Sequence, residues 1–276
     1  MKIAVASGKG GTGKTTVSLA LAEVLGTKGL LLDCDVEEPN CHLFFQMPAD
    51  KTTPVTVKIP SFNQDLCIGC HQCSDFCAFN AIANIGKKLL IFPELCHSCG
   101  GCAYLCPTKA IQEIDHKIGV LEYRKKGSVE LITGIMDVGN IIAVPIIHQV
   151  IAQADSHRTT ILDSPPGTAC PMVNTIRDAD FVILVTEPTP FGLYDLQLAQ
   201  DTLEAMNIPS GVIINRADDS CADVEAFCKS RNIDVLMKIP FSKKIATGYS
   251  NGDSLLTSAP ELKPKFTQLL QKLGGL

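Results

Sequence analysis

The sequence predicts an α/β fold in which helices cover both faces of a mostly parallel sheet. Six short apolar runs alternate with stretches long enough to form helices, and such near-continuous apolar strands are typical of parallel sheets buried on both sides. A glycine-rich loop lies between the first apolar run and a helical pattern, which indicates a strand, loop and helix in succession. Residues 120–144 alternate loosely and are expected to form connecting strands and turns. The expected main strands cover residues 3–6, 30–32, 160–162, 181–185, 212–214 and 235–239.

The composition narrows the class of protein. The chain has 276 residues, of which 46% are hydrophobic and 19% are charged, which excludes an intrinsically disordered chain. No apolar run reaches the roughly 18 residues of a membrane span. The net charge of −5 gives no reason to expect a nucleic-acid partner. The N-terminus lacks the pattern of a secretory signal, so we expect a cytoplasmic protein, in which clustered cysteines are more often metal ligands than disulfides.

Thirteen cysteines are distributed unevenly, and eight of them lie between Cys67 and Cys106. The residues around them, 61–116, show little apolar periodicity. We therefore predict that this stretch is a domain inserted into a host domain made of residues 1–60 and 117–276. The second half of the insert repeats the cysteine spacing of the first half, which indicates two copies of one small unit.

Residues 8–15 match the phosphate-binding pattern G-x-x-x-x-G-K-[ST], and they lie after an apolar strand and before a helix, as the mechanism requires. Glycines let successive backbone amides face a phosphate, and the start of the following helix adds partial positive charge. We expect Lys14 to reach the β and γ phosphates and Thr15 to bind Mg²⁺. The predicted nucleotide-binding residues of this segment are Gly8, Gly10, Gly11, Thr12, Gly13, Lys14, Thr15 and Thr16.

Lys9 is a second lysine that the general pattern does not require. Residues 9–15, KGGTGKT, resemble the deviant Walker A loop of the MinD/ParA/Mrp ATPases and of the nitrogenase iron protein. The resemblance implies that the chain binds ATP and forms a nucleotide-dependent homodimer, or a dimer with a related ATPase. It also implies that Lys9 reaches the partner's phosphates and acts in catalysis together with Lys14. We expect ATP turnover to be slow unless a partner stimulates it.

Two strand-end segments extend the resemblance. Residues 30–35, LLLDCD, resemble switch I, which implies that Asp35 orients or activates the attacking water. Residues 160–167, TILDSPPG, are similar to the Walker B and switch II segment. That similarity implies that Asp163 holds Mg²⁺ through water and that Gly167 senses the γ phosphate. Taken alone, either carboxylate could instead cap the helix that follows it.

A third pair of segments suggests the base of the nucleotide. Asn215 and Arg216 follow the expected strand at residues 212–214 and resemble the family's adenine-contacting pair. Pro240, in the sequence Ile239-Pro240-Phe241, is expected to form a wall of the same pocket. Both segments could equally be ordinary exits from strands.

Each half of the insert carries the spacing C-x-x-C-x-x-C-x-x-x-C, which matches bacterial ferredoxins and predicts two [4Fe-4S] clusters. The first copy ends in Cys77-Ala78, where ferredoxins commonly have proline, and the second ends in Cys106-Pro107. Zinc is the alternative, although zinc sites usually pair two short cysteine hooks across a longer gap. By resemblance to two-cluster ferredoxins, one cluster takes Cys67, Cys70, Cys73 and Cys106, and the other takes Cys96, Cys99, Cys102 and Cys77.

Three cysteines outside the insert also carry expectations. Cys221 and Cys228 are expected to be buried in a helix as small apolar residues. Cys170 follows Asp163 at the spacing at which a cluster-ligating cysteine follows the corresponding aspartate of the nitrogenase iron protein. That resemblance leaves two alternatives, a cluster shared across a dimer interface or a buried or interface thiol, and we favour the thiol.

The C-terminal stretch predicts an amphipathic helix, because Phe266, Leu269, Leu270 and Leu273 recur at helical spacing. MinD uses a short basic amphipathic tail to bind membranes, but the pattern of a lipid-binding stripe is the same as that of a core-facing one. We predict that this helix docks on the sheet, and membrane binding is not expected.

Together, the motifs make the chain similar to MinD-superfamily ATPases that carry an inserted two-cluster ferredoxin domain. The implied cofactors are ATP, Mg²⁺ and two [4Fe-4S] clusters. The leading hypothesis is an ATPase whose nucleotide-dependent dimer rearrangement gates electron transfer through the clusters to a redox partner protein, as in the nitrogenase iron protein. The alternative is a MinD/ParA/Mrp-like switch that positions a complex or carries Fe-S clusters, with the ferredoxin module as redox sensor or docking site.

Overall fold

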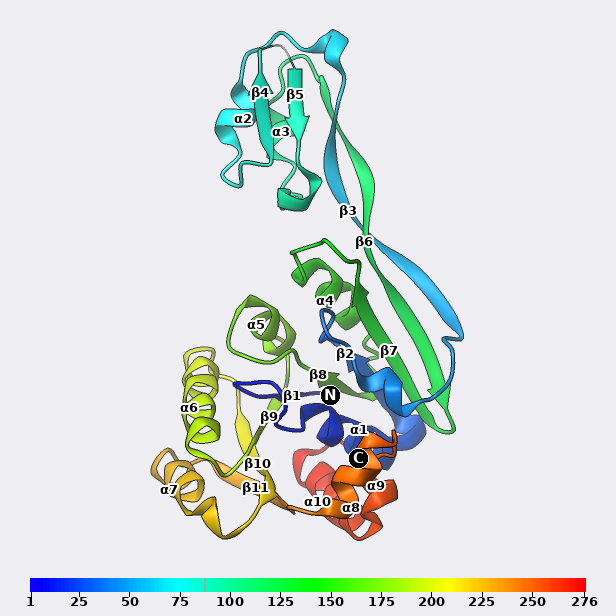
Figure 1. Ribbon diagram of the computed structural model, residues 1–276, viewed down its shortest axis with the longest axis vertical. Coiled ribbons are helices and arrows are strands. Elements are labelled where there is room, and N and C mark those ends of the chain that lie inside the picture. Colours follow the sequence, from blue (N-terminus) through cyan, green and yellow to red (C-terminus); the bar gives the residue numbers. More distant parts are fainter. Residues whose placement is uncertain (87) are drawn as a thin grey trace.

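A nine-stranded sheet organises the larger part of the chain (Figure 1), and the computed structural model describes residues 1–86 and 88–276. The strands in chain order are β1 (Lys2–Ala6), β2 (Gly29–Asp33), β3 (Lys51–Phe62), β6 (Ile111–Lys126), β7 (Val129–Met136), β8 (Thr159–Asp163), β9 (Phe181–Thr186), β10 (Ser210–Ala217) and β11 (Asp234–Pro240). Across the sheet the order is β11-β10-β9-β1-β8-β2-β7-β6-β3.

The strands from β11 to β7 are parallel, and β6 and β3 extend one edge in antiparallel pairing. All six strands predicted from apolar runs lie in the parallel part, so the prediction of a mostly parallel α/β sheet is confirmed. Residues 120–144 contribute β7 and part of β6, and β3 was not predicted. Its alternating pattern is weak because only part of the strand faces a core.

Helices cover both faces of the sheet. One face carries α1 (Lys14–Leu25), α8 (Lys243–Ser250), α9 (Leu255–Ser258) and α10 (Lys263–Leu273), and the other carries α4 (Val144–Ile151), α5 (Cys170–Ile176), α6 (Pro190–Ala205) and α7 (Ala222–Ser230). Alternate residues of β1 serve the two cores: Ile3 and Val5 pack with α1 and α10, whereas Ala4 and Ala6 belong to the core beneath α4 to α7. Short 3-10 turns are η1 (Gly26–Lys28), η2 (Cys41–Phe44), η3 (Gln64–Leu66), η4 (Pro93–Leu95), η5 (Asp219–Cys221) and η6 (Pro260–Leu262).

The C-terminal helix α10 docks on the body of the protein. Phe266 and Leu270 are fully buried, Leu269 is nearly so, and all three belong to the core that includes α1. The prediction of a docked helix is confirmed. Among the described residues, no helix has the length and apolar character that a membrane crossing requires.

Strands β3 and β6 form a long antiparallel ribbon that carries the cysteine-rich segment away from the sheet (Figure 1). Their pairing runs from Lys51 opposite Tyr123 to Phe62 opposite Ile111. The described residues between the two strands, 63–86 and 88–110, are called the cysteine module below. The module contains α2 (Gln72–Phe76), α3 (Gly101–Leu105) and a hairpin of β4 (Ile82–Ile85) and β5 (Lys88–Ile91). The predicted limits of the insert, residues 61 and 116, fall inside the two ribbon strands.

Candidate functional site

The carboxyl ends of five neighbouring strands bring together segments that lie far apart in the sequence. The sheet order β10-β9-β1-β8-β2 places the phosphate-binding loop after β1 between the ends of its neighbours. Asp163 ends β8, Asp35 follows β2, and Asn215 lies near the end of β10. In parallel α/β sheets this edge is where ligands bind, because loops and helix N-termini converge there.

The phosphate-binding loop takes a shape that depends on its glycines. Gly11 and Gly13 adopt φ angles of 79° and 100°, in the left-handed region that other residues rarely enter. Gly13 directly precedes α1, so the loop delivers the chain to a helix N-terminus. A Cβ atom at Gly13 would also collide with the amide nitrogen of Asn215. The backbone amides and the start of α1 therefore face the same space, which suits a phosphate.

A cavity of about 430 Å³ opens beside this loop. Its size is within the range of small-molecule sites. The predicted residues that line it are Gly10, Gly11, Gly13, Lys14, Thr15, Thr16, Asp35, Asn215, Arg216 and Pro240, together with Phe241. The sequence reasoning missed the other lining residues, which are Glu38, Asn40, Pro166, Ser242, Ile245, Ala246 and Tyr249. Ser242 had a sequence cue, because a serine before a helical stretch is a common N-cap, and its hydroxyl accepts from the Ile245 amide.

Four of the predicted nucleotide residues lie outside this cavity. Gly8, Lys9 and Thr12 line the side of the loop that faces β9 and α6. The Thr12 hydroxyl is buried and has no hydrogen-bond partner among the described residues. Gly167, with a φ of 91°, donates its amide to the Ser7 carbonyl at 3.0 Å. The loop after β8 is thus hydrogen-bonded directly to the start of the phosphate-binding loop.

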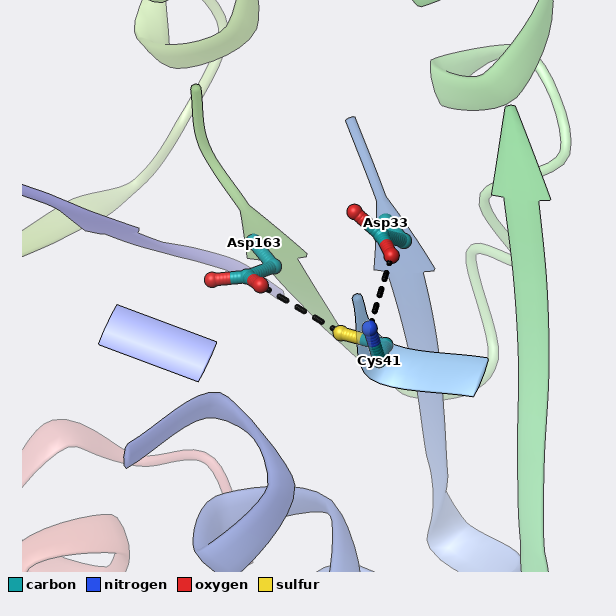
Figure 2. A group of neighbouring side chains, drawn as sticks. All are labelled: Asp33, Cys41 and Asp163. Atoms are coloured by element: carbon teal, nitrogen blue, oxygen red, sulfur yellow. Dashed lines mark hydrogen bonds between the residues drawn. The ribbon is translucent and has the colours of Figure 1, made fainter. Parts of the chain in front are cut away.

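Asp163 is buried and accepts hydrogen bonds from three side chains, of which Figure 2 shows the one from Cys41. Its Oδ2 accepts from the Thr15 hydroxyl at 2.7 Å and from the Cys41 thiol at 3.3 Å, and its Oδ1 accepts from the Ser18 hydroxyl at 2.8 Å. Asp33 Oδ2 accepts from the Cys41 amide at 3.1 Å. Sequence reasoning assigned no role to Ser18, Asp33 or Cys41, because only the fold brings Ser18 and Cys41 close to Asp163 at the end of β8.

The donor set around Asp163 suits Mg²⁺. In the described part of the chain, only Asp33, Cys41 and Asp163 form a group of three or more His, Cys, Asp or Glu whose ligand atoms all lie within 4.8 Å of one another. Carboxylate and hydroxyl oxygens, which Asp33, Asp163 and Thr15 provide, are the ligands that this hard cation prefers. The Cys41 thiol is the unusual member of the group.

Burial shifts the pKa values of the charged groups in this site, and the charge of each group affects the pKa values of the others. Burial raises the pKa of Asp35 to about 6, while the Lys14 ammonium opposes the rise and the Asp163 carboxylate adds to it. Burial also raises the pKa of Asp163, and it raises that of Asp33 well above the usual range. The Lys14 pKa is lowered by burial, against the attraction of the carboxylates. Several buried carboxylates with one lysine favour the binding of a cation.

The raised pKa of Asp35 predicts a pH-dependent gain in stability when the charge is removed. Asp35 contributes stability below its unfolded pKa, and this contribution is lost as the pH rises through about 6. In the nucleotide-free and Mg²⁺-free protein, Asp35→Asn should therefore raise the unfolding free energy by about 1–2 kcal/mol at pH 7.5 and much less at pH 4.5. Denaturant melts at the two pH values measure this. An exposed turn residue, changed as Asp178→Asn, is the control, and an equal gain at both pH values would contradict the prediction.

Asn215 and Arg216 are tied to the phosphate-binding loop. Asn215 Nδ2 donates to the Thr12 carbonyl at 2.8 Å, and Asn215 Oδ1 accepts from the Arg216 amide at 2.9 Å. Arg216 has a φ of 52°, which is uncommon for a residue with a side chain. Its guanidinium lies 2.6 Å from Glu187 Oε1, a residue that the sequence reasoning did not single out.

The cysteine module holds two cavities, and each is lined by four of the eight predicted ligands. A cavity of about 270 Å³ is lined by Cys77, Cys96, Cys99 and Cys102, and one of about 20 Å³ is lined by Cys67, Cys70, Cys73 and Cys106. Backbone amides point at three of the sulfur atoms: Gly69 donates to Cys67 at 3.4 Å, Ser98 to Cys96 at 3.5 Å and Ala110 to Cys106 at 3.2 Å. Each cavity thus receives the last cysteine of the opposite copy.

The module also touches the body of the protein. A hollow of about 30 Å³ is lined by Cys96 and His97 on the module side and by Ile141 and Pro145 on the body side. Pro145 belongs to α4, which packs against α5, and the His148 ring is 3.0 Å from the side-chain oxygen of Asn174. The helix α5 in turn follows the loop after β8, the strand that Asp163 ends.

The other cysteines have three different environments. Cys221 and Cys228 are buried in the core, which confirms their prediction as small apolar residues. Cys170, at the start of α5, is exposed in the single chain, so its thiol is not buried within this chain; an interface thiol and a shared cluster both stay predictions. The proline at the second position of α5 helps to begin the helix at Cys170, and this leaves the thiol in solvent.

Comparisons with known proteins agree with the geometry. The sequence matches the family model described as "CobQ/CobB/MinD/ParA nucleotide binding domain" over residues 3–255. An uncharacterized protein of Methanocaldococcus jannaschii is 33% identical over 278 residues, which cover 99% of this chain and 96% of that protein. An uncharacterized ATP-binding protein of the same organism is 26% identical over 254 residues, or 89% of this chain and 76% of that protein. The septum site-determining protein MinD of Pyrococcus horikoshii, solved with Mg-ADP, has the same fold, with a TM-score of 0.59, 20% identity and coverage of 99% and 95% of the two chains.

Proposed function

Because the chain belongs to the CobQ/CobB/MinD/ParA nucleotide-binding domain family, we propose that it is an ATP-hydrolysing iron-sulfur protein. In this proposal, a nucleotide-dependent dimer switch controls electron transfer through two [4Fe-4S] clusters to a partner protein. The observation that carries it is that one chain joins a phosphate-binding cavity to a module with two four-cysteine cavities. The ATP-binding relative and the Mg-ADP complex of the P. horikoshii protein support an adenine nucleotide.

The nucleotide half of the proposal rests on residues that line or underlie one cavity. The loop amides and Lys14 would hold the β and γ phosphates, and Asn215 and Arg216 would contact the adenine. Thr15 and Asp163 would hold Mg²⁺, which supplies charge neutralisation for the phosphates when bound. Asp35 lines the same cavity, where its carboxylate can accept a hydrogen bond from the attacking water.

The cluster half of the proposal rests on the arrangement of sulfur atoms. Four thiolates on a single zinc ion would lie about 3.8 Å apart, since each Zn–S bond is about 2.3 Å. Among the described residues, no three of the module's cysteines have sulfur atoms that all lie within 4.8 Å of one another. This wider spacing favours a cluster over one small ion. Clusters of this kind supply one-electron redox chemistry when bound, and the amides that donate to sulfur would tune their potentials.

The contact between module and body supports the coupling of the two halves. The hollow beside His97 is lined by Pro145 of α4, and α4 packs on α5, which follows the loop that begins directly after Asp163. A rearrangement of that loop by nucleotide would therefore displace elements that touch the module. To demonstrate such coupling, nucleotide binding must produce a measurable change at the clusters.

The test compares the reduction potentials of the anaerobically purified protein in its nucleotide-free, ADP-bound and ATP-bound forms. We expect the potential, or the rate of electron delivery to an acceptor, to change with ATP. Identical values in the three forms would refute the gating of electron transfer. A second measurement follows the transfer of labelled clusters from this protein to an apo-protein. If the wild type transfers clusters and a variant with all eight module cysteines replaced does not, the result would instead favour a carrier.

The two four-cysteine cavities predict which variants lose the same cluster. Changing Cys67 to alanine should remove the same iron as changing Cys106, although Cys106 belongs to the other sequence copy. Each variant should keep about half of the wild-type iron, because one of two clusters is lost. Iron assays, with electron paramagnetic resonance of the reduced proteins, would measure this. The double variant should keep as much iron as either single variant, and a further loss would contradict the shared site. Cys228→Ala, a buried cysteine outside the module, is the control.

A further inference from the structure

The Glu187 carboxylate lies beside two cations, Arg216, which the proposed function assigns to the adenine, and Lys9, which the resemblance to deviant Walker A loops assigns to the phosphates of a partner chain. Glu187 directly follows β9, and the sheet order places β9 between β1, which leads to Lys9, and β10, which carries Arg216. Glu187 Oε1 lies 2.6 Å from Arg216 Nη1, and Oε2 lies 3.9 Å from Lys9 Nζ. The topology of the sheet therefore brings the three charges together.

The three side chains differ in exposure. The side chain of Glu187 is 12% exposed, whereas those of Lys9 and Arg216 are 33% and 58% exposed. The carboxylate lies mostly buried just after the end of β9, whereas Lys9 extends from the phosphate-binding loop and Arg216 extends from β10, and both are more exposed. A second chain can reach the cations but not the carboxylate, so an anion on that chain competes with Glu187 for them.

Both cations are also bound to the phosphate-binding loop. Lys9 belongs to the loop, and Arg216 is linked to it through Asn215, whose side chain joins the Arg216 amide to the Thr12 carbonyl. Contacts therefore run from the loop through Asn215 and Arg216 to Glu187, and from Glu187 back to the loop through Lys9. Because Lys9 and Arg216 pair with the same carboxylate, a change in one ion pair alters the attraction that Glu187 exerts on the other cation.

We propose that Glu187 is a positioning residue that holds Lys9 away from the dimer interface in the single chain. This inference rests on the proposed function. Formation of the ATP-bound dimer requires Lys9 to exchange the Glu187 carboxylate for the phosphates bound by a second copy of this chain. The freed carboxylate then pairs with Arg216 alone, which links the adenine end of one site to the pairing of two chains.

The charge-neutral variant Glu187→Gln tests this proposal, because glutamine has nearly the same shape. Sedimentation velocity with the β,γ-imido analogue of ATP measures the dissociation constant of the dimer without hydrolysis. Ion pairs between partly exposed side chains change an equilibrium by about twofold to fivefold, so the variant should dimerise more tightly by that factor. A weaker dimer would overturn the proposal, since it would place the carboxylate among the contacts that stabilise the dimer.

Glu130 provides a matched control. It also bridges a lysine and an arginine, with Lys125 at 2.8 Å and Arg158 at 2.6 Å, but it lies on β7, away from the loop. Glu130→Gln should leave the dimer unchanged, and an equal effect of the two variants would overturn the proposal. If Glu187→Gln does not fold, Glu187→Asp keeps the charge but draws it back from Lys9, and it should also tighten the dimer; an unchanged or weaker dimer would overturn the proposal.

A third variant separates this inference from the proposed function. If the wild-type chain does not dimerise with the ATP analogue, or if Lys9→Ala leaves the dimer intact, the role of Lys9 across the dimer fails and the inference fails with it. If Lys9→Ala abolishes the dimer while Glu187→Gln does not tighten it, only the inference about Glu187 fails.

Discussion

Replacing Asp35 by alanine is expected to lower the rate of ATP hydrolysis by about 100-fold or more while ATP remains bound. Asp35 follows β2 and lines the nucleotide cavity beside Lys14 and Thr15. Its pKa of about 6 leaves most of it ionised at neutral pH, so the carboxylate can orient a water molecule. ATP binding should persist because the loop amides, Lys14 and Arg216, which would hold the nucleotide, all remain in the variant.

Phosphate release at saturating ATP and equilibrium dialysis with ATP measure the two quantities separately. Glu38 is the matched control, because it is another carboxylate on the same loop and it lines the same cavity. Glu38→Ala should retain most of the hydrolysis rate. Undiminished hydrolysis in Asp35→Ala would refute the assignment of Asp35, and lost ATP binding would indicate a structural role instead.

The second large effect is expected for Gly8→Ala. A Cβ atom at Gly8 would collide with the backbone carbonyl of Asp195 in α6, and backbone cannot move aside as a flexible side chain can. Either the phosphate-binding loop or α6 must shift. Overpacking of this kind costs about 1–3 kcal/mol, and we expect the variant to lose that much unfolding free energy. A shifted loop should also bind ATP at least about tenfold more weakly, because its amides must converge on the phosphates.

Gly10→Ala is the control for Gly8→Ala. Gly10 belongs to the same loop, but a Cβ atom there would meet no other atom within 4 Å. Thermal melts should show Gly10→Ala close to the wild type and Gly8→Ala clearly below it. Equal melting of the two variants would contradict the packing argument.

The parallel part of the fold was predictable because its strands are buried on both faces. Strands such as β2 and β8 consist of residues with little or no exposure, so their apolar runs are unbroken. The strand β3 escaped prediction because much of it is solvent-exposed, and its pairing with β6 is set by residues far away in the sequence. Long antiparallel ribbons leave a weaker pattern than buried strands do.

The residues of the site fall into two groups: some are recognisable from short motifs, and others gain their partners only from segments far away in the sequence. The loop residues and the eight cysteines could be singled out as candidates because the motifs that carry their chemistry lie within short segments, and the fold gathers them around cavities. Cys41, Ser18 and Glu187 could not, since each acquires its partners only when strands from different parts of the chain become neighbours. Tyr249 lines the cavity through α8, which no motif connected with the nucleotide.

The ribbon has a consequence for how the two halves of the protein fold. Its strands enter and leave the cysteine module side by side, with Phe62 paired to Ile111 at the module end. Cys73, Ile82 and Cys102 of the module form a small core with Ile111 of β6, separate from the two cores of the sheet. An insertion whose ends are adjacent adds only a loop-closure cost to its host, and this cost grows slowly with length. The host sheet can therefore form before the module is complete, and assembly of the module does not require the host to unfold.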